Sequence, residues 1–262
     1  MKRAFIDTPE GQIYYQTEGS GEPVLLLHKA SLSSEEFSEL LPLLGKNYRA
    51  IAMDVLGCGN SDQPKFVPRV EDYARNTIHF LDALKIEKIN IAGRLFGASV
   101  AIEMAVTHPE RVNKLILLDI LHVPSEELQR ARNDFKNETV NFKEDGSHLV
   151  EVWKGRGGRP GANLEMVQRA AVEYLKSGLG TRAGDSHRAK VEYDVAPRLP
   201  KIKQPVLLLY SEKSRFFDRA AEGTKKLIPH SSAKLIKGTP SFPTWENPKE
   251  YAQAIIEFLQ QP

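Results

Sequence analysis

The chain alternates short apolar runs with segments of helical periodicity, and this alternation constrains the fold more than any other feature. The apolar runs, rich in valine, isoleucine and leucine, cover residues 24–27, 50–53, 89–92, 115–118, 206–210 and 233–236. Such runs are typical of strands that are buried on both faces of a parallel sheet. The helical patterns cover 35–44, 70–84, 98–107 and 248–259. Strands alternating with helices predict a doubly wound, mostly parallel α/β sheet with right-handed crossovers.

Two stretches depart from this alternation. Residues 4–7 and 12–17 flank a Pro-Glu-Gly turn, which predicts an antiparallel N-terminal hairpin. Residues 122–199 are polar and helical in places, without the apolar runs of the rest of the chain. We therefore predict one core α/β domain, formed by residues 1–121 and 200–262, with residues 122–199 inserted as a helical cap.

Composition excludes several classes of function. The 262 residues include 36 basic and 34 acidic side chains, so the net charge of +2 provides no strong field for nucleic acid or an anionic membrane. Cys58 is the single cysteine, which excludes an internal disulfide and a cysteine-rich metal site. No apolar run approaches the roughly 20 residues of a membrane helix, and no secretion signal is evident. We expect a cytoplasmic protein that binds a small molecule and needs no cofactor or metal; the oligomeric state stays open.

The sheet predicts where a site would lie. In open α/β sheets, ligands bind at the carboxyl ends of the strands. The positions that follow the apolar runs are 28–29, 54, 93–97, 119–122, 211–214 and 238–243. A cap that leaves the core after residue 118 would cover the same edge as a lid, enclosing a pocket and excluding water.

Six segments, in this order, resemble the α/β-hydrolase superfamily over essentially the whole chain. They are LLLH at 25–28, DVLGCGNSD at 54–62, GRLFGAS at 93–99, HPERV at 108–112, PVLLLY at 205–210 and FPTWENP at 242–248. The third segment stands between a predicted strand and a predicted helix, where that family has its Gly-x-Ser-x-Gly nucleophile elbow. The resemblance implies the lidded α/β-hydrolase fold and a catalytic triad at fixed positions.

The triad positions that the resemblance implies are all replaced. Leu95 stands at the centre of the elbow and has no lone pair with which to attack. Ser214 stands where the family has its acid, and Ser241 where it has its histidine. Loss of the nucleophile of such a set costs about 10⁶ in kcat. We therefore expect no conventional serine hydrolase.

Polar side chains beside the altered elbow are candidates for other roles. Lys29 replaces the second residue of the family's His-Gly oxyanion turn, so its ammonium could hold an anionic ligand or point to solvent. Arg94 could pair with a substrate carboxylate, or structurally with Asp119 or Asp54. His122 could form an acid–base pair with Asp119, since an unperturbed histidine has a pKa near 6.5; alternatively, both are structural.

Apolar side chains complete the predicted pocket. Leu95, Phe96 and Phe242 would form an apolar floor, which suits a hydrophobic small molecule or a site that has filled in. Trp153 would line the roof or pack within the cap. The ligand-binding residues that we predict are His28, Lys29, Arg94, Leu95, Phe96, His122, Trp153, Ser214, Ser241 and Phe242.

These observations leave three functions open. The one we favour is a non-hydrolytic enzyme, such as a lyase, isomerase or cyclase, that acts on a hydrophobic small molecule by orientation and electrostatics. The second is a pseudoenzyme that binds a small molecule without catalysis. The third is a weak or unconventional hydrolase.

Overall fold

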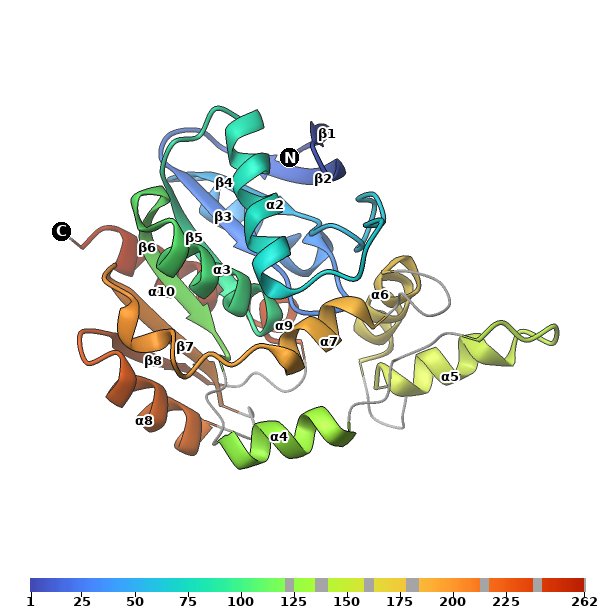
Figure 1. Ribbon diagram of the computed structural model, residues 1–262. Helices are drawn as coiled ribbons and strands as arrows, with labels where there is room; N and C mark the ends of the chain where they lie inside the picture. The colour runs from blue at the N-terminus through green and yellow to red at the C-terminus, as the bar shows by residue number, and fades with distance from the viewer. Residues whose placement is uncertain are drawn as a thin grey trace.

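The structure is a computed structural model that describes residues 1–120, 125–134, 141–157, 163–177, 184–212, 217–237 and 242–261. A mixed sheet of eight strands forms the centre of these described residues (Figure 1). The strand order is β1-β2-β4-β3-β5-β6-β7-β8. The strands are β1 (Lys2–Thr8), β2 (Gly11–Glu18), β3 (Pro23–Leu27), β4 (Arg49–Met53), β5 (Ile89–Arg94), β6 (Val112–Leu118), β7 (Val206–Ser211) and β8 (Ser232–Ile236). β2 is antiparallel to β1 and β4, and the other pairs are parallel. The predicted sheet and hairpin are confirmed.

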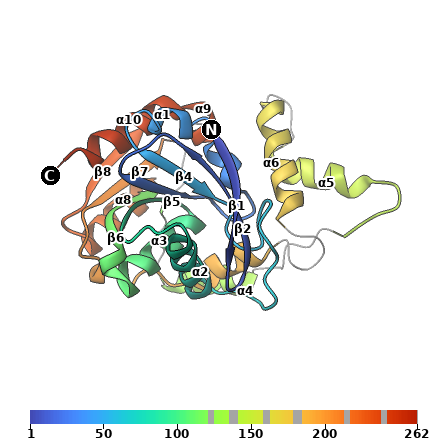
Figure 2. The same cartoon turned by 90° about the horizontal axis from the view of Figure 1, so that it is seen from above.

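Alternate residues of the central strands pack into two cores. In β3, Leu25 and Leu27 join the larger core, while Val24 and Leu26 join the second core on the opposite face. This follows from the two-residue period of a strand, and both faces of these strands are apolar because both are covered. Figure 2 shows the covering helices along the two sides of the sheet. They are α2 (Val70–Ala83) and α3 (Phe96–Thr107) on one side, and α1 (Leu41–Leu44), α9 (Pro243–Glu246) and α10 (Pro248–Leu259) on the other.

In the described residues, four α-helices lie between β6 and β7. They are α4 (Ser125–Asp134), α5 (Ser147–Gly155), α6 (Leu164–Lys176) and α7 (Asp185–Glu192), and α5 and α6 stand away from the sheet in both views. α7 returns to the core, where Ala189 is buried and the Tyr193 hydroxyl donates to Glu103 of α3 at 2.6 Å. The limits of a separate cap at residues 122 and 199 stay predictions.

The remaining elements are short connections and one helix beside β7. They are η1 (Ser34–Phe37), η2 (Pro109–Arg111), η3 (Leu199–Lys201) and α8 (Phe217–Leu227). Among the described residues, no helix is long and apolar enough to cross a membrane. Because β3, β4, β5, β6 and β7 run in parallel, their carboxyl ends meet at one edge, which positions the candidate site.

Candidate functional site

β5 leads into α3 through a tight turn centred on Leu95. The leucine has φ 48° and ψ −101°, a left-handed conformation that costs a non-glycine residue free energy. The Leu95 N–H donates to the Leu118 carbonyl at 3.0 Å, which ties the turn to β6. A Cβ at Gly93 would overlap the Gly97 carbonyl, and a Cβ at Gly97 would overlap the Leu27 carbonyl, so both positions require glycine. The chain thus forms a strand-to-helix elbow with an aliphatic side chain at its centre.

Arg94, the last residue of β5, lies in a buried network of charges. Its Nη1 donates to Oε1 of Glu36, and its Nε donates to Oδ2 of Asp119 at 3.2 Å. Oδ1 of Asp119 accepts hydrogen bonds from the Ser211 N–H and hydroxyl at 2.9 and 2.8 Å. Burial by itself lowers the pKa of Arg94, but the two carboxylates outweigh burial and hold that pKa above its ordinary value. Arg94 and Asp119 therefore form the structural pair that was one of the two alternatives.

Lys29 follows β3 and lies beside this network. Its backbone N–H donates to Oε2 of Glu36 at 2.7 Å, and its Nζ lies 5.6 Å from the ring centroid of Phe242. Among the described residues, Nζ has no hydrogen-bond acceptor and no carboxylate partner. Burial, followed by the positive charge of Arg94, lowers the pKa of Lys29 from 10.5 to about 8. About a tenth of the amine is therefore neutral at pH 7 and about half at pH 8, far more than in an ordinary lysine.

Lys190 of α7 is a second amine near Arg94. Burial and the Arg94 charge lower its pKa, and within the described residues it has no ion-pair or hydrogen-bond partner. The position of α7 at this edge is fixed by Ser186, whose hydroxyl accepts a hydrogen bond from the Ser31 N–H at 3.1 Å. The sequence pattern did not single out Lys190, because its proximity to Arg94 depends on how α7 packs.

His28 is buried, and its ring is held by backbone groups. Nδ1 lies 2.8 Å from the Lys29 carbonyl, and Nε2 accepts a hydrogen bond from the Val55 N–H at 3.1 Å. These partners assign the proton to Nδ1 and the lone pair to Nε2. Because both ring nitrogens are occupied, His28 supports the turn after β3 and has no nitrogen left for proton transfer.

Two of the predicted aromatic residues come together under α6. Trp153 of α5 packs against an apolar cluster that contains Leu32, Phe242 and Trp245, together with Val167 and Ala170 of α6. The Phe242 and Trp245 rings are stacked with centroids 5.3 Å apart. Phe96 lies elsewhere: its ring packs edge to face against Tyr73 in the larger core, with centroids 4.9 Å apart. The structure therefore places Phe96 away from this edge.

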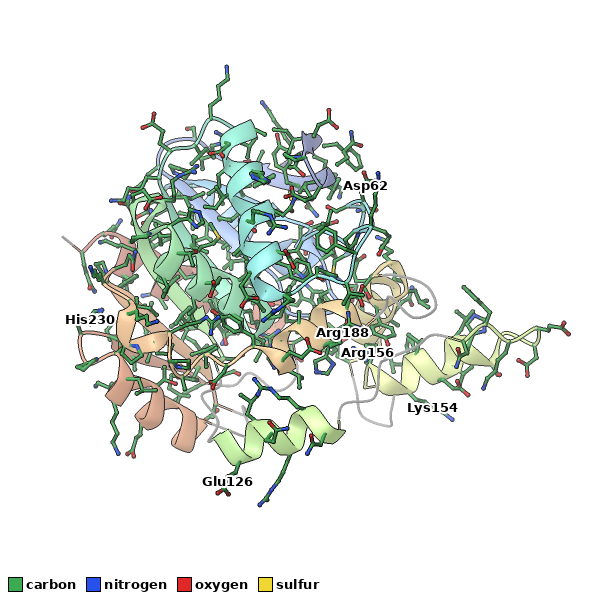
Figure 3. The ribbon with its side chains drawn as sticks, in the orientation of Figure 1. Asp62, Glu126, Lys154, Arg156, Arg188 and His230 are labelled. Carbon is green, nitrogen blue, oxygen red and sulfur yellow. The ribbon has the colours of Figure 1, made fainter. Side chains whose placement is uncertain are left out.

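Three predicted positions, His122, Ser214 and Ser241, lie outside the described residues. His230, whose ring lies 3.1 Å from the Gln204 carbonyl, precedes β8 at the amino ends of the parallel strands and, in Figure 3, lies far from α5 and α6. It therefore cannot serve the elbow. In the described ranges, no three histidine, cysteine, aspartate or glutamate side chains are grouped to hold a metal ion.

Comparison with known proteins decides the family. A family model described as the alpha/beta hydrolase fold matches residues 22–248. The chain belongs to the α/β-hydrolase family. Among solved structures, the α/β-hydrolase chain resembles a bromoperoxidase from Bacillus anthracis with a TM-score of 0.79, at 20% identity, over 99% of this chain and 100% of the other. That likeness shows the fold alone, and the family match confirms the resemblance drawn from the six segments.

Curated relatives of this α/β hydrolase match nearly its whole length. A protein of Metapseudomonas resinovorans named 2-hydroxy-6-oxo-6-(2'-aminophenyl)hexa-2,4-dienoic acid hydrolase is 30% identical over 98% of this chain and 90% of its own. A Pseudomonas putida protein named 2-hydroxy-6-oxononadienedioate/2-hydroxy-6-oxononatrienedioate hydrolase 2 is 26% identical, over 95% and 92%. Both names state hydrolysis of a small molecule.

These names correct the expected chemistry. The favoured reading as a lyase, isomerase or cyclase, and the second reading as a non-catalytic pseudoenzyme, are wrong, because relatives over the full chain are named as hydrolases. The inference failed because it took the residues at the three triad positions, Leu95, Ser214 and Ser241, as a measure of the reaction class. Hydrolysis requires activated water and a polarised carbonyl, and a serine is only one route to them.

Proposed function

We propose that this chain is a hydrolase of small carboxylates in which water attacks the substrate directly, without a serine-histidine-aspartate relay. The names of the two curated relatives support the reaction class and the acidic substrate. The replaced positions Leu95, Ser214 and Ser241 support the absence of the relay. The single observation that carries the proposal is the amine of Lys29, which is unpaired among described residues and has its pKa lowered to about 8.

Lys29 is suited to act as the general base. Near pH 8 about half of its amine is neutral and can accept a proton. As the water oxygen bonds to the substrate carbonyl carbon, Nζ takes one of the water protons. The same proton then passes to the leaving atom as its bond to the carbonyl carbon breaks, so the amine is regenerated. Burial of the side chain, followed by the positive charge of Arg94, keeps the neutral form accessible.

Lys190 is suited to hold the substrate carboxylate. Its ammonium has no carboxylate of its own in the described part of the chain, whereas the Arg94 guanidinium is already shared between Glu36 and Asp119. A substrate carboxylate beside Lys190 would supply the missing counter-charge. The two amines then have separate roles: Lys190 binds the anion, and Lys29 moves the proton.

The test is hydrolysis of 2-hydroxy-6-oxo-6-(2'-aminophenyl)hexa-2,4-dienoic acid, followed by chromatography of the products. We expect the purified protein to hydrolyse it, and Lys29→Met to lower kcat by about 10²–10⁴-fold, the usual contribution of a general base. Lys190→Met should raise KM more than it lowers kcat. The matched control is Lys46→Met, at an exposed lysine with no hydrogen-bond or ion-pair partner among the described residues, which should change neither constant.

Two results would contradict the proposal. One is full activity in Lys29→Met, which would leave the reaction without the proposed base. The other is a covalent acyl adduct on any serine in the intact-protein mass spectrum during turnover, which would reveal a side-chain nucleophile. A rate for the unaltered protein no greater than that of heat-denatured protein would also overturn it.

A further inference from the structure

A cavity of about 780 Å³ lies between the N-terminal hairpin and α6, apart from the elbow. One wall is the hairpin, the other is α6, and the loops after β3 and β4 close one end. None of Lys29, Arg94, Leu95 or Phe242 lines it. Its volume is within the range of small-molecule sites, roughly 300–1,000 Å³. The cavity is therefore a candidate for a second binding site.

The hairpin wall is built from two cross-strand pairs. Arg3 of β1 is paired with Gln16 of β2, and Phe5 with Tyr14. Because residues two apart in a strand share a face, all four side chains lie on the same side of the hairpin. The Phe5 and Tyr14 rings meet edge to face with centroids 5.1 Å apart, and Phe5 is 53% exposed. An exposed aromatic of this kind offers a surface on which a planar ring can pack.

Two polar groups of this wall lack partners. Gln16 is only 3% exposed; its Nε2 donates to the Ser34 hydroxyl at 3.1 Å, but Oε1 has no hydrogen-bond partner among the described residues. A buried amide oxygen without a donor costs free energy, so native proteins rarely leave one in this state. The guanidinium of Arg3 likewise has no ion pair or hydrogen bond within the described ranges.

The α6 wall, in contrast, is already satisfied and ordered. Arg169 donates to Oε1 of Glu35 at 2.8 Å and stacks on the Trp245 ring at 4.5 Å. Glu173 accepts from Lys176 at 2.8 Å and from the Ser33 hydroxyl. These contacts fix α6 against η1 and neutralise the central charges of α6. Of the cations that line the cavity, Arg3 is thus the one left to meet an anion, as far as the described residues show.

We propose that this cavity binds a planar aromatic carboxylate that carries a hydroxyl or amino group. Its ring packs against Phe5 and Tyr14, and its carboxylate pairs with the guanidinium of Arg3. Its hydroxyl or amino group donates to the free amide oxygen of Gln16. This site is independent of the hydrolysis proposed for the elbow, and a ligand here bridges the core and α6.

The test is calorimetric titration with 4-hydroxybenzoate as the probe. We expect saturable binding to one site, weakened about 10-fold or more by Arg3→Gln and about 2–10-fold by Phe5→Ala. Two controls should bind as the unaltered protein does: Lys2→Gln, at the neighbouring β1 position on the opposite face, and Phe66→Ala, at another exposed aromatic. Cyclohexanecarboxylate lacks the ring π-system, and 4-hydroxybenzamide lacks the charge, so each should bind at least 5-fold more weakly.

Three outcomes would overturn the proposal. The first is the absence of saturable binding to the unaltered protein. The second is unchanged affinity in both Arg3→Gln and Phe5→Ala, which would place the probe elsewhere. The third is loss of binding in Lys29→Met, which would show that the probe occupies the elbow; because this variant leaves the cavity intact, it also separates the two proposals.

Discussion

Replacing Lys29 with methionine should stabilise the protein at pH 7. The pKa of this amine is about 8 in the fold and 10.5 ordinarily, so folding works against its positive charge. The difference of 2.5, at about 1.36 kcal/mol for each pKa unit, sets a ceiling of about 3.4 kcal/mol. The side chain is only half-buried and solvent screens part of the charge, so we expect a gain of about 1–2 kcal/mol. Methionine preserves the length and apolar contacts of the side chain.

The pH dependence distinguishes this explanation from better packing. The destabilising effect of the Lys29 charge is complete below pH 8 and fades as the pH rises towards 10.5, because the unfolded chain binds the extra proton in that window. The advantage of Lys29→Met should therefore be largest at pH 7 and close to zero above pH 10.5. An advantage that does not change with pH would instead come from packing.

Urea denaturation at pH 7, 8.5 and 10.5 measures this effect. We expect the variant and the parent to have equal m-values, so that a shift of the midpoint reports a change in stability. Lys46→Met, at an exposed lysine, is the control and should shift the unfolding free energy by less than about 0.5 kcal/mol at every pH. A Lys29→Met protein that is less stable than the parent at pH 7 would refute the reasoning, since it would mean that the ammonium makes a favourable contact in the fold.

Two further substitutions test the elbow and its charges. Arg94→Met leaves the buried carboxylates of Glu36 and Asp119 without their cation, so it should lower the unfolding free energy by about 3–5 kcal/mol at pH 7. Urea denaturation measures this loss, and a loss below about 1 kcal/mol would contradict the network. Gly97→Ala forces a Cβ into the carbonyl at the end of β3 and should cost about 3 kcal/mol in thermal unfolding, while Gly155→Ala, in open space, should cost little.

The sheet could be predicted because its signal is local. Strands such as β3 and β7 are buried on both faces, so each appears in the sequence as an unbroken apolar run. The elbow was predictable because Gly93 and Gly97 lie in one short segment of the chain, although the backbone that Gly97 approaches is the Leu27 carbonyl at the end of β3. In both cases the residues that carry the signal are neighbours in the chain.

The charges of the candidate site could be predicted only in part. A structural pair of Arg94 with Asp119 or Asp54 was one of the two alternatives for Arg94, because all three stand at the carboxyl ends of strands, and the structure has the pair with Asp119. Glu36, which contacts Arg94 across 58 positions of sequence, gave no pattern of its own, since its placement depends on how η1 packs over the sheet edge. Lys190 was missed for the same reason, because α7 reaches Arg94 only through tertiary packing.

The strained turn at Leu95 shows what the site keeps when the side chain at its centre cannot attack. The elbow still presents the amino end of α3, where the Gly97 N–H donates to the His28 carbonyl at 3.1 Å, while the Phe96 N–H has no partner within the helix and can stabilise a developing oxyanion. In hydrolases whose triad has been removed, such donors and substrate binding alone still give a rate enhancement of about 10³–10⁴ over water. A general base at Lys29 would multiply this rate by a further factor of about 10²–10⁴. The product, about 10⁵–10⁸, overlaps the lower end of enzymatic rate enhancements. A water-attack hydrolase on this scaffold would therefore be slow for its family, but would remain an enzyme.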